Sequence, residues 1–219
     1  MSDGSRALRE EIIATAVAMN AAGINRGTSG NVSARYRDAS YDGFLITPSG
    51  LAYERTRAED IAAVTLAGEA SGPRAPSSEW RFHLDIYRSR ADVHAIVHTH
   101  APFATTLACM DRAIPAFHYM VAIAGGRDIR CAPYATFGTQ KLSEHAVRAL
   151  EDRLACLLEH HGMIAVGPSL SKAMWLAVEV EALARQYHGC LQIGTPRLLP
   201  KAEIKNVLGR IAGYGPAGK

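Results

Sequence analysis

Apolar residues along this chain fall into helix-spaced stretches and short strand-like runs that alternate from end to end. Between Leu8 and Met19 they recur at the spacing of one helix face, so residues 5–22 are expected to form a helix that ends near Gly23. Further helices are expected at residues 79–88, 102–110, 143–153, 171–188 and 202–211. Strands are expected at residues 31–36, 44–47, 93–98, 156–158 and 163–166, the last two as a hairpin.

The remaining segments are less regular. Residues 59–66 are ambiguous between a short helix and a strand, and residues 71–76 and 114–137 are expected to be loops. No internal repeat, linker or low-complexity tract interrupts the chain. The mixture of strands and helices predicts one α/β domain over residues 1–219, with a sheet covered by helices on both faces.

Composition and charge exclude several classes of function. The 24 basic and 21 acidic residues are interspersed, which argues against a nucleic-acid partner. No apolar run approaches the roughly 20 residues that span a membrane, and the first residues lack the apolar core of a signal peptide. The four cysteines are far apart, so we expect reduced, buried thiols and a cytoplasmic location.

The histidines point to a metal site. Residues two apart on a strand face the same side, so His98 and His100 can bring two imidazoles to one ion. A third imidazole from the pair at 160–161 and the carboxylate of Glu79 would complete a tetrahedral set of the kind that zinc accepts.

Each of these residues also has a plain structural explanation. A histidine pair in a hairpin is common at a surface, and Glu79 suits the first turn of a helix, where a negative charge is favourable. His94 shares the alternation of His98 but lies further back, and a structural or supporting role is favoured for it. Two histidines on one face of a buried strand are harder to explain in this way, because each would need its own hydrogen-bond partner.

Small hydroxyl residues indicate an anion site. Two turns, at residues 27–31 and 47–50, are rich in Gly, Ser and Thr, and Ser77 and Ser78 precede a predicted helix N-terminus. Hydroxyl groups and backbone N–H groups of such turns can cradle a phosphate. None of the turns matches a Walker loop, a dinucleotide fingerprint or a serine-hydrolase elbow.

Seven ordered blocks of sequence carry a resemblance to a known family. They are GTSGNVSARY, LITPSG, SSEWRFH, VHTHAP, IPAFHYM with the AGG that follows, CAPYATFGT and HHGMIAVG. Together they resemble the class II aldolase/adducin family, most closely its aldolases for L-fuculose 1-phosphate, over about residues 8–195. The resemblance implies a mixed, mostly antiparallel sheet flanked by helices, and a homotetramer with active sites between subunits.

The resemblance also implies roles for individual residues. His98, His100 and His161 would bind one zinc ion per subunit. Glu79 would be a fourth ligand in the resting site, leave the metal when substrate binds, and then move a proton. Tyr119 would handle a proton at the aldehyde oxygen from a neighbouring subunit, and Phe137 would line the aldehyde pocket. The residues implied in the phosphate pocket are Thr28, Asn31, Ser49, Gly50, Ser77 and Ser78.

The implied reaction is reversible cleavage of a 2-ketose 1-phosphate, of the L-fuculose 1-phosphate type, to dihydroxyacetone phosphate and a short aldehyde such as L-lactaldehyde. The ligand set does not separate this substrate from 5-deoxyribulose or 5-methylthioribulose 1-phosphate. A dehydratase or epimerase of the same family is disfavoured by Glu79 and Tyr119, and a non-enzymatic, adducin-like module by retention of every ligand. Tyr214 is a further residue that would reach the site if the C-terminal tail folds back.

Overall fold

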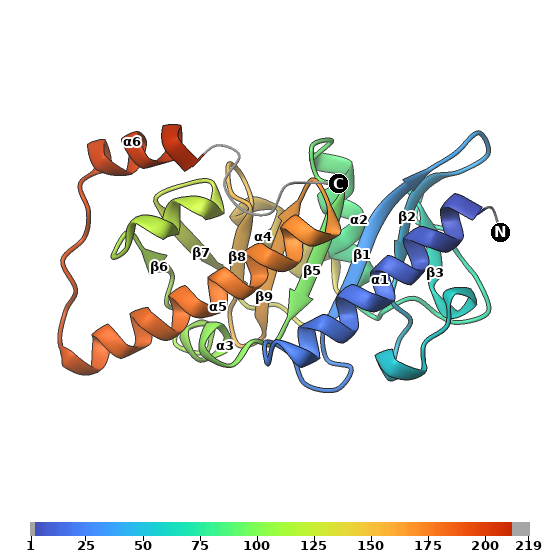
Figure 1. The fold of residues 1–219 in the computed structure, drawn as a ribbon, viewed down its shortest axis with the longest axis horizontal. Coiled ribbons are helices and arrows are strands. Elements are labelled where there is room, and N and C mark those ends of the chain that lie inside the picture. Colours follow the sequence, from blue (N-terminus) through green and yellow to red (C-terminus); the bar gives the residue numbers. More distant parts are fainter. Residues whose placement is uncertain (1–2, 212–219) are drawn as a thin grey trace.

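Helices and strands alternate through the computed structural model, which describes residues 3–211 (Figure 1). The strands are β1 (Asn31–Arg37), β2 (Asp42–Ile46), β3 (Ala62–Thr65), β4 (Ala70–Ser71), β5 (Ala95–Thr99), β6 (Ile114–Pro115), β7 (Asp128–Ala132), β8 (Ala155–Leu158) and β9 (Gly162–Gly167). The helices are α1 (Asp3–Ala21), α2 (Trp80–Ser89), α3 (Pro102–Ala108), α4 (Gln140–Ala149), α5 (Leu170–Ile193) and α6 (Lys201–Ile211), with 3-10 turns η1 (Tyr53–Arg55), η2 (Ala58–Asp60) and η3 (Tyr119–Ala124).

The strands of the described chain form one sheet in the order β4-β3-β2-β1-β5-β9-β8-β7-β6. Neighbouring strands run antiparallel except β7 and β8, which are parallel. The expectation of a mixed, mostly antiparallel sheet is therefore confirmed. Strands β5 and β9 lie at its centre and are fully buried. Strand β5 contains His98, and β9 begins directly after His161.

Two apolar cores lie on opposite sides of this sheet. One packs β1, β5 and β9 against α1, α3 and α5, and includes Ile12 and Met19 of α1. The other packs the opposite face against α2 and α4, and includes Phe82 and Tyr87. Each large side chain that is buried in this way contributes about 1.5–3 kcal/mol. Both faces are thus covered, as the sequence pattern predicted, and α1 and α5 lie on the near face in Figure 1.

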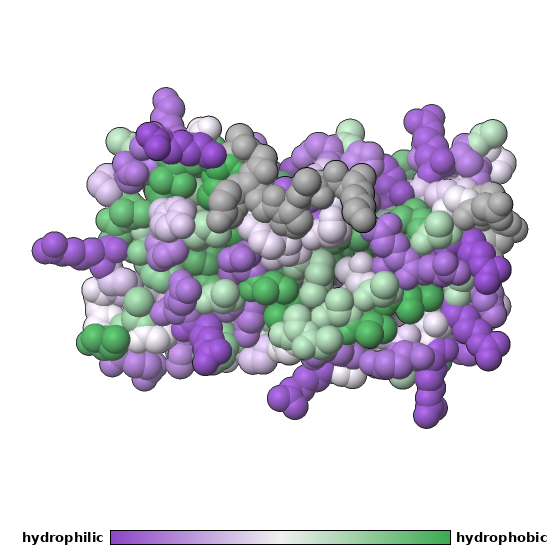
Figure 2. Space-filling view, in the orientation of Figure 1, coloured by the Kyte–Doolittle hydropathy of each residue, from purple (hydrophilic) through white to green (hydrophobic). Residues whose placement is uncertain are grey.

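The near face is not uniformly polar. Figure 2 shows hydrophobic residues between hydrophilic ones, gathered most clearly below α6. A cavity of about 380 Å³ between η3, α5 and α6 is lined mainly by apolar side chains such as Trp175 and Leu208. Along the described residues, no helix is long and apolar enough to cross a membrane.

Most expected elements appear within a few residues of their predicted bounds, with three small corrections and one large one. Residues 59–66 hold both alternatives in succession, the end of η2 and then β3. The expected loop at 71–76 begins with the last residue of β4, and the helix expected at 143–153 spans Gln140–Ala149. It starts early because the hydroxyl of Thr139 caps it by accepting a hydrogen bond from the N–H of Leu142.

The largest error is the expected loop at 114–137, which contains β6, η3 and β7. Strand β7 reads DIRCA, and its charged residues mask the apolar signal. It owes its strand conformation to parallel pairing with β8, which no local pattern reveals. All four cysteines are free, but the expectation of buried thiols holds only for Cys156, because Cys131 and Cys190 are half-buried and Cys109 is exposed at the end of α3.

The close approach of β5 and β9 yields a prediction at Gly162. A methyl group there would lie 2.6 Å from the carbonyl oxygen of Thr99 and 3.0 Å from the ring of His100. We expect Gly162→Ala to cost about 1–3 kcal/mol of unfolding free energy, as overpacking does elsewhere, and to displace His100. Urea denaturation measures the cost. Gly189→Ala in α5 is the control, because a methyl group there meets nothing within 4 Å. Equal stability of the two variants would contradict the prediction.

Candidate metal centre

Four chain segments meet at one end of the sheet: the end of β5, the start of β9, the start of β1 and the N-terminus of α2. Strand β5 ends there with His98 and Thr99, and β9 begins there directly after His161. Asn31, the first residue of β1, pairs with His98, and Met163 pairs with Thr99. The antiparallel register therefore brings the His98–His100 segment and the β8–β9 turn to the same edge.

The alternation of strand β5 sets the direction of the imidazoles. His98 is fully buried, and its Nδ1 lies 2.9 Å from the carbonyl oxygen of Met163. Thr99 turns to the other face, where its hydroxyl donates to the carbonyl oxygen of Ile24. Thr99 therefore takes no direct part in the histidine cluster. His94 is exposed, so the supporting role favoured for it is not seen.

Glu79 lies between two of the histidines. It is the N-cap residue of α2 and only 5% exposed. Its Oε2 is 3.1 Å from Nε2 of His98, and its Oε1 is 2.9 Å from Nε2 of His161. One ligand atom from each of these three residues and from His100 lies within 4.8 Å of all the others. Ligands about 2.1 Å from an ion at a tetrahedral centre are about 3.4 Å apart, so the cluster is close to the required size.

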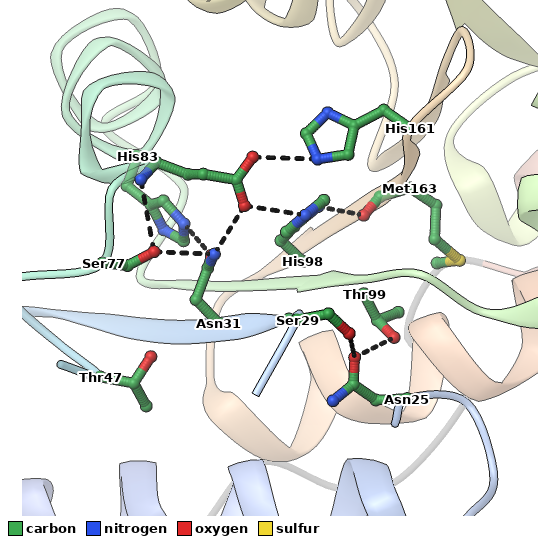
Figure 3. Close-up of polar contacts among 12 residues, drawn as sticks. Asn25, Ser29, Asn31, Thr47, Ser77, His83, His98, Thr99, His161 and Met163 are labelled. Atoms are coloured by element: carbon green, nitrogen blue, oxygen red, sulfur yellow. Dashed lines mark hydrogen bonds and ion pairs between the residues drawn. The ribbon is translucent and has the colours of Figure 1, made fainter. Parts of the chain in front are cut away.

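The hydrogen bonds of the cluster fit a metal ion. The buried side-chain atoms without a hydrogen-bond partner, among the described residues, include Oε1 of Glu79 and Nε2 of both His98 and His100. Figure 3 shows the contact between the ring of His98 and the carbonyl oxygen of Met163. Because a carbonyl oxygen can only accept, Nδ1 of His98 must donate, and a neutral His98 then turns its lone pair toward the cluster from Nε2. Leaving such atoms unpaired costs about 1–3 kcal/mol each, which a bound divalent cation would offset.

Protonation states point the same way. Burial, aided by the neighbouring His98, lowers the pKa of His100 to about 4, so this imidazole is neutral near pH 7. Burial alone would raise the pKa of Glu79, but its contacts with His98 and His161 outweigh burial and hold that pKa below its usual range. Neutral imidazoles and an ionised carboxylate are the forms in which these side chains bind metals.

A cleft of about 440 Å³ opens beside the cluster. Glu79, His100 and His161 line it. Four of the residues predicted to hold phosphate also line it: Thr28, Ser49, Gly50 and Ser78. Gly50 adopts a positive φ of 69°, which favours glycine in this turn.

The backbone ties the turns around the cleft together. The N–H of Ser49 donates to the carbonyl oxygen of Ala75, and the N–H of Ser77 donates to that of Thr47. Both loops are thereby fixed beside the N-terminus of α2, which carries positive partial charge. The described lining contains no Lys or Arg, so neutral donors and this helix end are what it offers an anion.

The structure places the other predicted residues less directly. Asn31 and Ser77 are buried behind the cleft wall, where Nδ2 of Asn31 donates to Oγ of Ser77. A phosphate role for them requires that these side chains change partners when substrate binds. Phe137 lines the cleft and is 64% exposed. Tyr214 lies outside the described residues.

Tyr119 is absent from the cleft lining of its own chain and is 51% exposed. It begins η3, which His118 caps by accepting a hydrogen bond from the N–H of Met120. A catalytic Tyr119 must therefore act on the site of another copy of the chain, which is the arrangement that the resemblance implied.

Sequence reasoning missed two residues near the site. Tyr134 lines the cleft, and its ring lies edge-on to that of His160. His83 is fully buried, with Nε2 2.6 Å from Oδ1 of Asn31. A signal for His83 was available, because it follows Glu79 by four residues and so lies on the same helix face.

Comparisons with known proteins agree with this geometry. The sequence model of the Class II Aldolase and Adducin N-terminal domain matches residues 10–188. This chain belongs to the class II aldolase/adducin family. It is an enzyme of the metal-dependent class II aldolases, as its motifs predicted.

Individual relatives cover nearly the whole chain. A 5-methylthioribulose-1-phosphate/5-deoxyribulose-1-phosphate aldolase from Rhodospirillum rubrum is 57% identical, covering 97% of this chain and 95% of its own. An L-fuculose phosphate aldolase from Escherichia coli is 49% identical, covering 95% of each chain. A solved L-fuculose 1-phosphate aldolase superposes with a TM-score of 0.90 at 36% identity, covering 97% of this chain and 98% of that one.

The cluster predicts how the protein binds a divalent ion. We expect one Zn²⁺ per chain in isothermal titration of metal-free protein, and at least about 100-fold weaker binding for His100→Ala, since losing a ligand should exceed the 10–100-fold effect of an outer contact. His94→Ala is the control, because that exposed histidine lies outside the cluster. If both substitutions weakened zinc binding equally, or if His100→Ala left it unchanged, the ion would bind outside this cluster.

Proposed function

We propose that this class II aldolase cleaves a 2-ketose 1-phosphate between C3 and C4, reversibly, to dihydroxyacetone phosphate and a short aldehyde. The observation that carries the proposal is the cleft itself. Its lining combines Glu79, His100 and His161 of the cluster with hydroxyl residues such as Ser49 and Ser78 and with an apolar side formed by Tyr134, Ala135 and Phe137. A phosphate at the hydroxyl residues and an apolar tail at the apolar side would leave the ketone and its neighbouring hydroxyl to the cluster.

The apolar side favours particular tails. Tyr134 and Phe137 present carbon surface, which suits the methyl group of 5-deoxyribulose 1-phosphate or the methylthio group of 5-methylthioribulose 1-phosphate. The relative from Rhodospirillum rubrum bears the names of both substrates. L-Fuculose 1-phosphate is the second candidate, supported by the relative from Escherichia coli and by the solved structure. It would release L-lactaldehyde, whose hydroxyl group needs a polar partner on this side.

Separate groups of residues bind the phosphate and hold the metal. Thr28, Ser49, Gly50 and Ser78 bind and orient the phosphate, which supplies binding energy remote from the bond that breaks. A zinc ion held by Glu79 and the three histidines would stabilise, as a Lewis acid, the negative charge that develops on the ketone and hydroxyl oxygens.

Two side chains move the protons. Tyr119 of a neighbouring subunit takes the proton from the C4 hydroxyl as the C3–C4 bond breaks and C4 becomes the aldehyde carbon. The bonding electrons pass to the dihydroxyacetone phosphate part as an enediolate. Glu79, which is ionised at rest, takes the proton of the C3 hydroxyl group and delivers it to C3, and the proton on Tyr119 passes to the C3 oxygen, so that each side chain ends as it began. Glu79 is placed for this task because it lines the cleft while contacting His98 and His161.

The same proposal includes the assembly and the location of the enzyme. Tyr119 is exposed and outside its own cleft, so a homotetramer that brings it to a neighbouring site would complete the machinery. A phosphorylated sugar as substrate and free thiols are both in keeping with a cytoplasmic enzyme.

A coupled assay for dihydroxyacetone phosphate tests the reaction. With zinc-loaded protein, we expect release from 5-deoxyribulose and 5-methylthioribulose 1-phosphates at a higher kcat/KM than from L-fuculose 1-phosphate. EDTA should abolish release, and Glu79→Gln should abolish it in a folded protein, because an amide cannot carry the proton. If a folded, zinc-loaded protein released nothing from all three, aldol cleavage would be excluded and the dehydratase and epimerase reactions of the family would come next.

Mixed oligomers test the place of Tyr119. Tyr119→Phe alone should lower kcat by about 10²–10⁴-fold, the range of a general acid or base. When Tyr119→Phe and Glu79→Gln chains are unfolded and reassembled together, about a quarter of the sites combine an intact Glu79 with an intact neighbouring Tyr119. We therefore expect activity to return to roughly a quarter of the wild-type value. A mixture no more active than its two components would show that Tyr119 does not act across a subunit boundary.

A further inference from the structure

A continuous row of buried hydrogen bonds leads from the core of the protein to Glu79. The hydroxyl of Tyr87 lies 2.8 Å from Oγ of Ser33, and Oγ of Ser33 lies 2.7 Å from Nδ1 of His83. On the other side of the ring, Nε2 of His83 is 2.6 Å from Oδ1 of Asn31. Nδ2 of Asn31 is 3.0 Å from Oε2 of Glu79, and Figure 3 shows Asn31 beside Ser77 and His83.

The carboxylate fixes the direction of every hydrogen in this row. Ionised Glu79 only accepts, so the amide of Asn31 must turn its NH₂ group toward Oε2 and its carbonyl oxygen toward His83. Nε2 of His83 must then carry a hydrogen, and Nδ1 accepts one from the hydroxyl of Ser33. Burial, together with the neighbouring His98, lowers the pKa of His83 to about 3, which keeps the ring in this neutral form.

The two oxygens of Glu79 are therefore unequal. Oε2 accepts a hydrogen bond from Asn31, whereas Oε1 accepts none among the described residues and lies 2.9 Å from Nε2 of the candidate metal ligand His161. The hydrogens of the Asn31 NH₂ group are both engaged, one with Glu79 and one with Oγ of Ser77. This amide thus holds the plane of the carboxylate, and what holds the amide is the N–H of His83.

We propose that His83 is a positioning residue for the aldol reaction: through Asn31 it fixes the Glu79 carboxylate so that Oε1 is the oxygen that exchanges a proton with the substrate. The inference rests on the proposed function of Glu79. Without the N–H of His83, the carbonyl oxygen of Asn31 has lost its donor, and the amide is held only through its NH₂ group. The amide and the carboxylate that it contacts would then lose their fixed orientation.

A buried polar row also has a purely structural explanation, because it satisfies the hydrogen-bonding groups of the core. The two explanations differ in what a substitution changes. A structural role predicts that loss of His83 lowers stability and leaves the turnover of the folded enzyme unchanged. A positioning role predicts a loss of kcat with little change in KM or metal binding. It also predicts that kcat recovers with any side chain at position 83 that donates a hydrogen bond to Oδ1 of Asn31.

The test compares His83→Phe with His83→Gln in the zinc-loaded, full-length enzyme. Phe keeps the stacking of this ring on Phe82 and Phe44 but cannot donate, whereas the amide of Gln can donate to Asn31. For His83→Phe we expect kcat to fall by about 10–100-fold, with KM within about threefold and one zinc per chain retained. For His83→Gln we expect kcat within about fivefold of the wild-type value.

Ser143→Ala is a matched control. Ser143 is fully buried and its hydroxyl donates to Asp85 of α2, away from Asn31 and Glu79. This variant loses a buried hydrogen bond to the same helix, and we expect it to keep its full turnover. Unchanged kcat in folded His83→Phe, or an equal loss of kcat in the Phe and Gln variants, would overturn the proposal.

Asn31→Asp provides a second test if His83→Phe does not fold. The substitution keeps the shape of the side chain but sets a carboxylate oxygen against Oε2 of Glu79. We expect at least the same 10–100-fold loss of kcat, and a folded, fully active Asn31→Asp enzyme would overturn the proposal. Failure of the aldolase function itself would look different, because the wild-type enzyme would then release no dihydroxyacetone phosphate at all.

Discussion

The molecule depends on bringing unshared electron pairs together at one buried point. Within residues 3–211, Nε2 of His98, Nε2 of His100 and Oε1 of Glu79 have no hydrogen-bond partner, and His161 contacts the same carboxylate. In a protein interior such groups repel one another and lose their contacts with water, which costs about 1–3 kcal/mol for each unpaired group. A cation bound at this point would accept these electron pairs and so offset the free-energy cost of leaving them unpaired. The fold can be understood as the support that keeps these groups in place.

The antiparallel sheet provides that support with short connections between its strands. Because β1, β5 and β9 are neighbours, the start of β1, the end of β5 and the start of β9 meet at one edge without a long connection. Both faces are covered by apolar cores, so the edge is rigid while the loops beside it remain open to substrate. The proposed phosphate side of the cleft then needs only hydroxyl residues in turns that the backbone already fixes.

The sequence was sufficient for the parts of the fold that follow local rules. The spacing of apolar residues predicted the helices α1 and α5, and the apolar run of β5 predicted a strand. The alternation along a strand also predicted that His98 and Thr99 point in opposite directions. Strand β7 does not, because its pairing partner β8 lies more than 20 residues further along the chain. The same limit applied to His83, whose partners Asn31 and Ser33 are brought to it only by the packing of α2 on β1. The resemblance of seven sequence blocks located the site as a whole, but it did not show that Asn31 faces Glu79.

The central claim is that Glu79 and the three histidines hold the catalytic metal together. Anomalous diffraction from crystals of the active, zinc-loaded enzyme, collected on both sides of the zinc absorption edge, tests it most directly. The account predicts one anomalous peak per chain, within about 2.0–2.3 Å of Nε2 of His98, His100 and His161 and of a Glu79 oxygen. An active crystal form whose zinc peak lies away from these four side chains would contradict it.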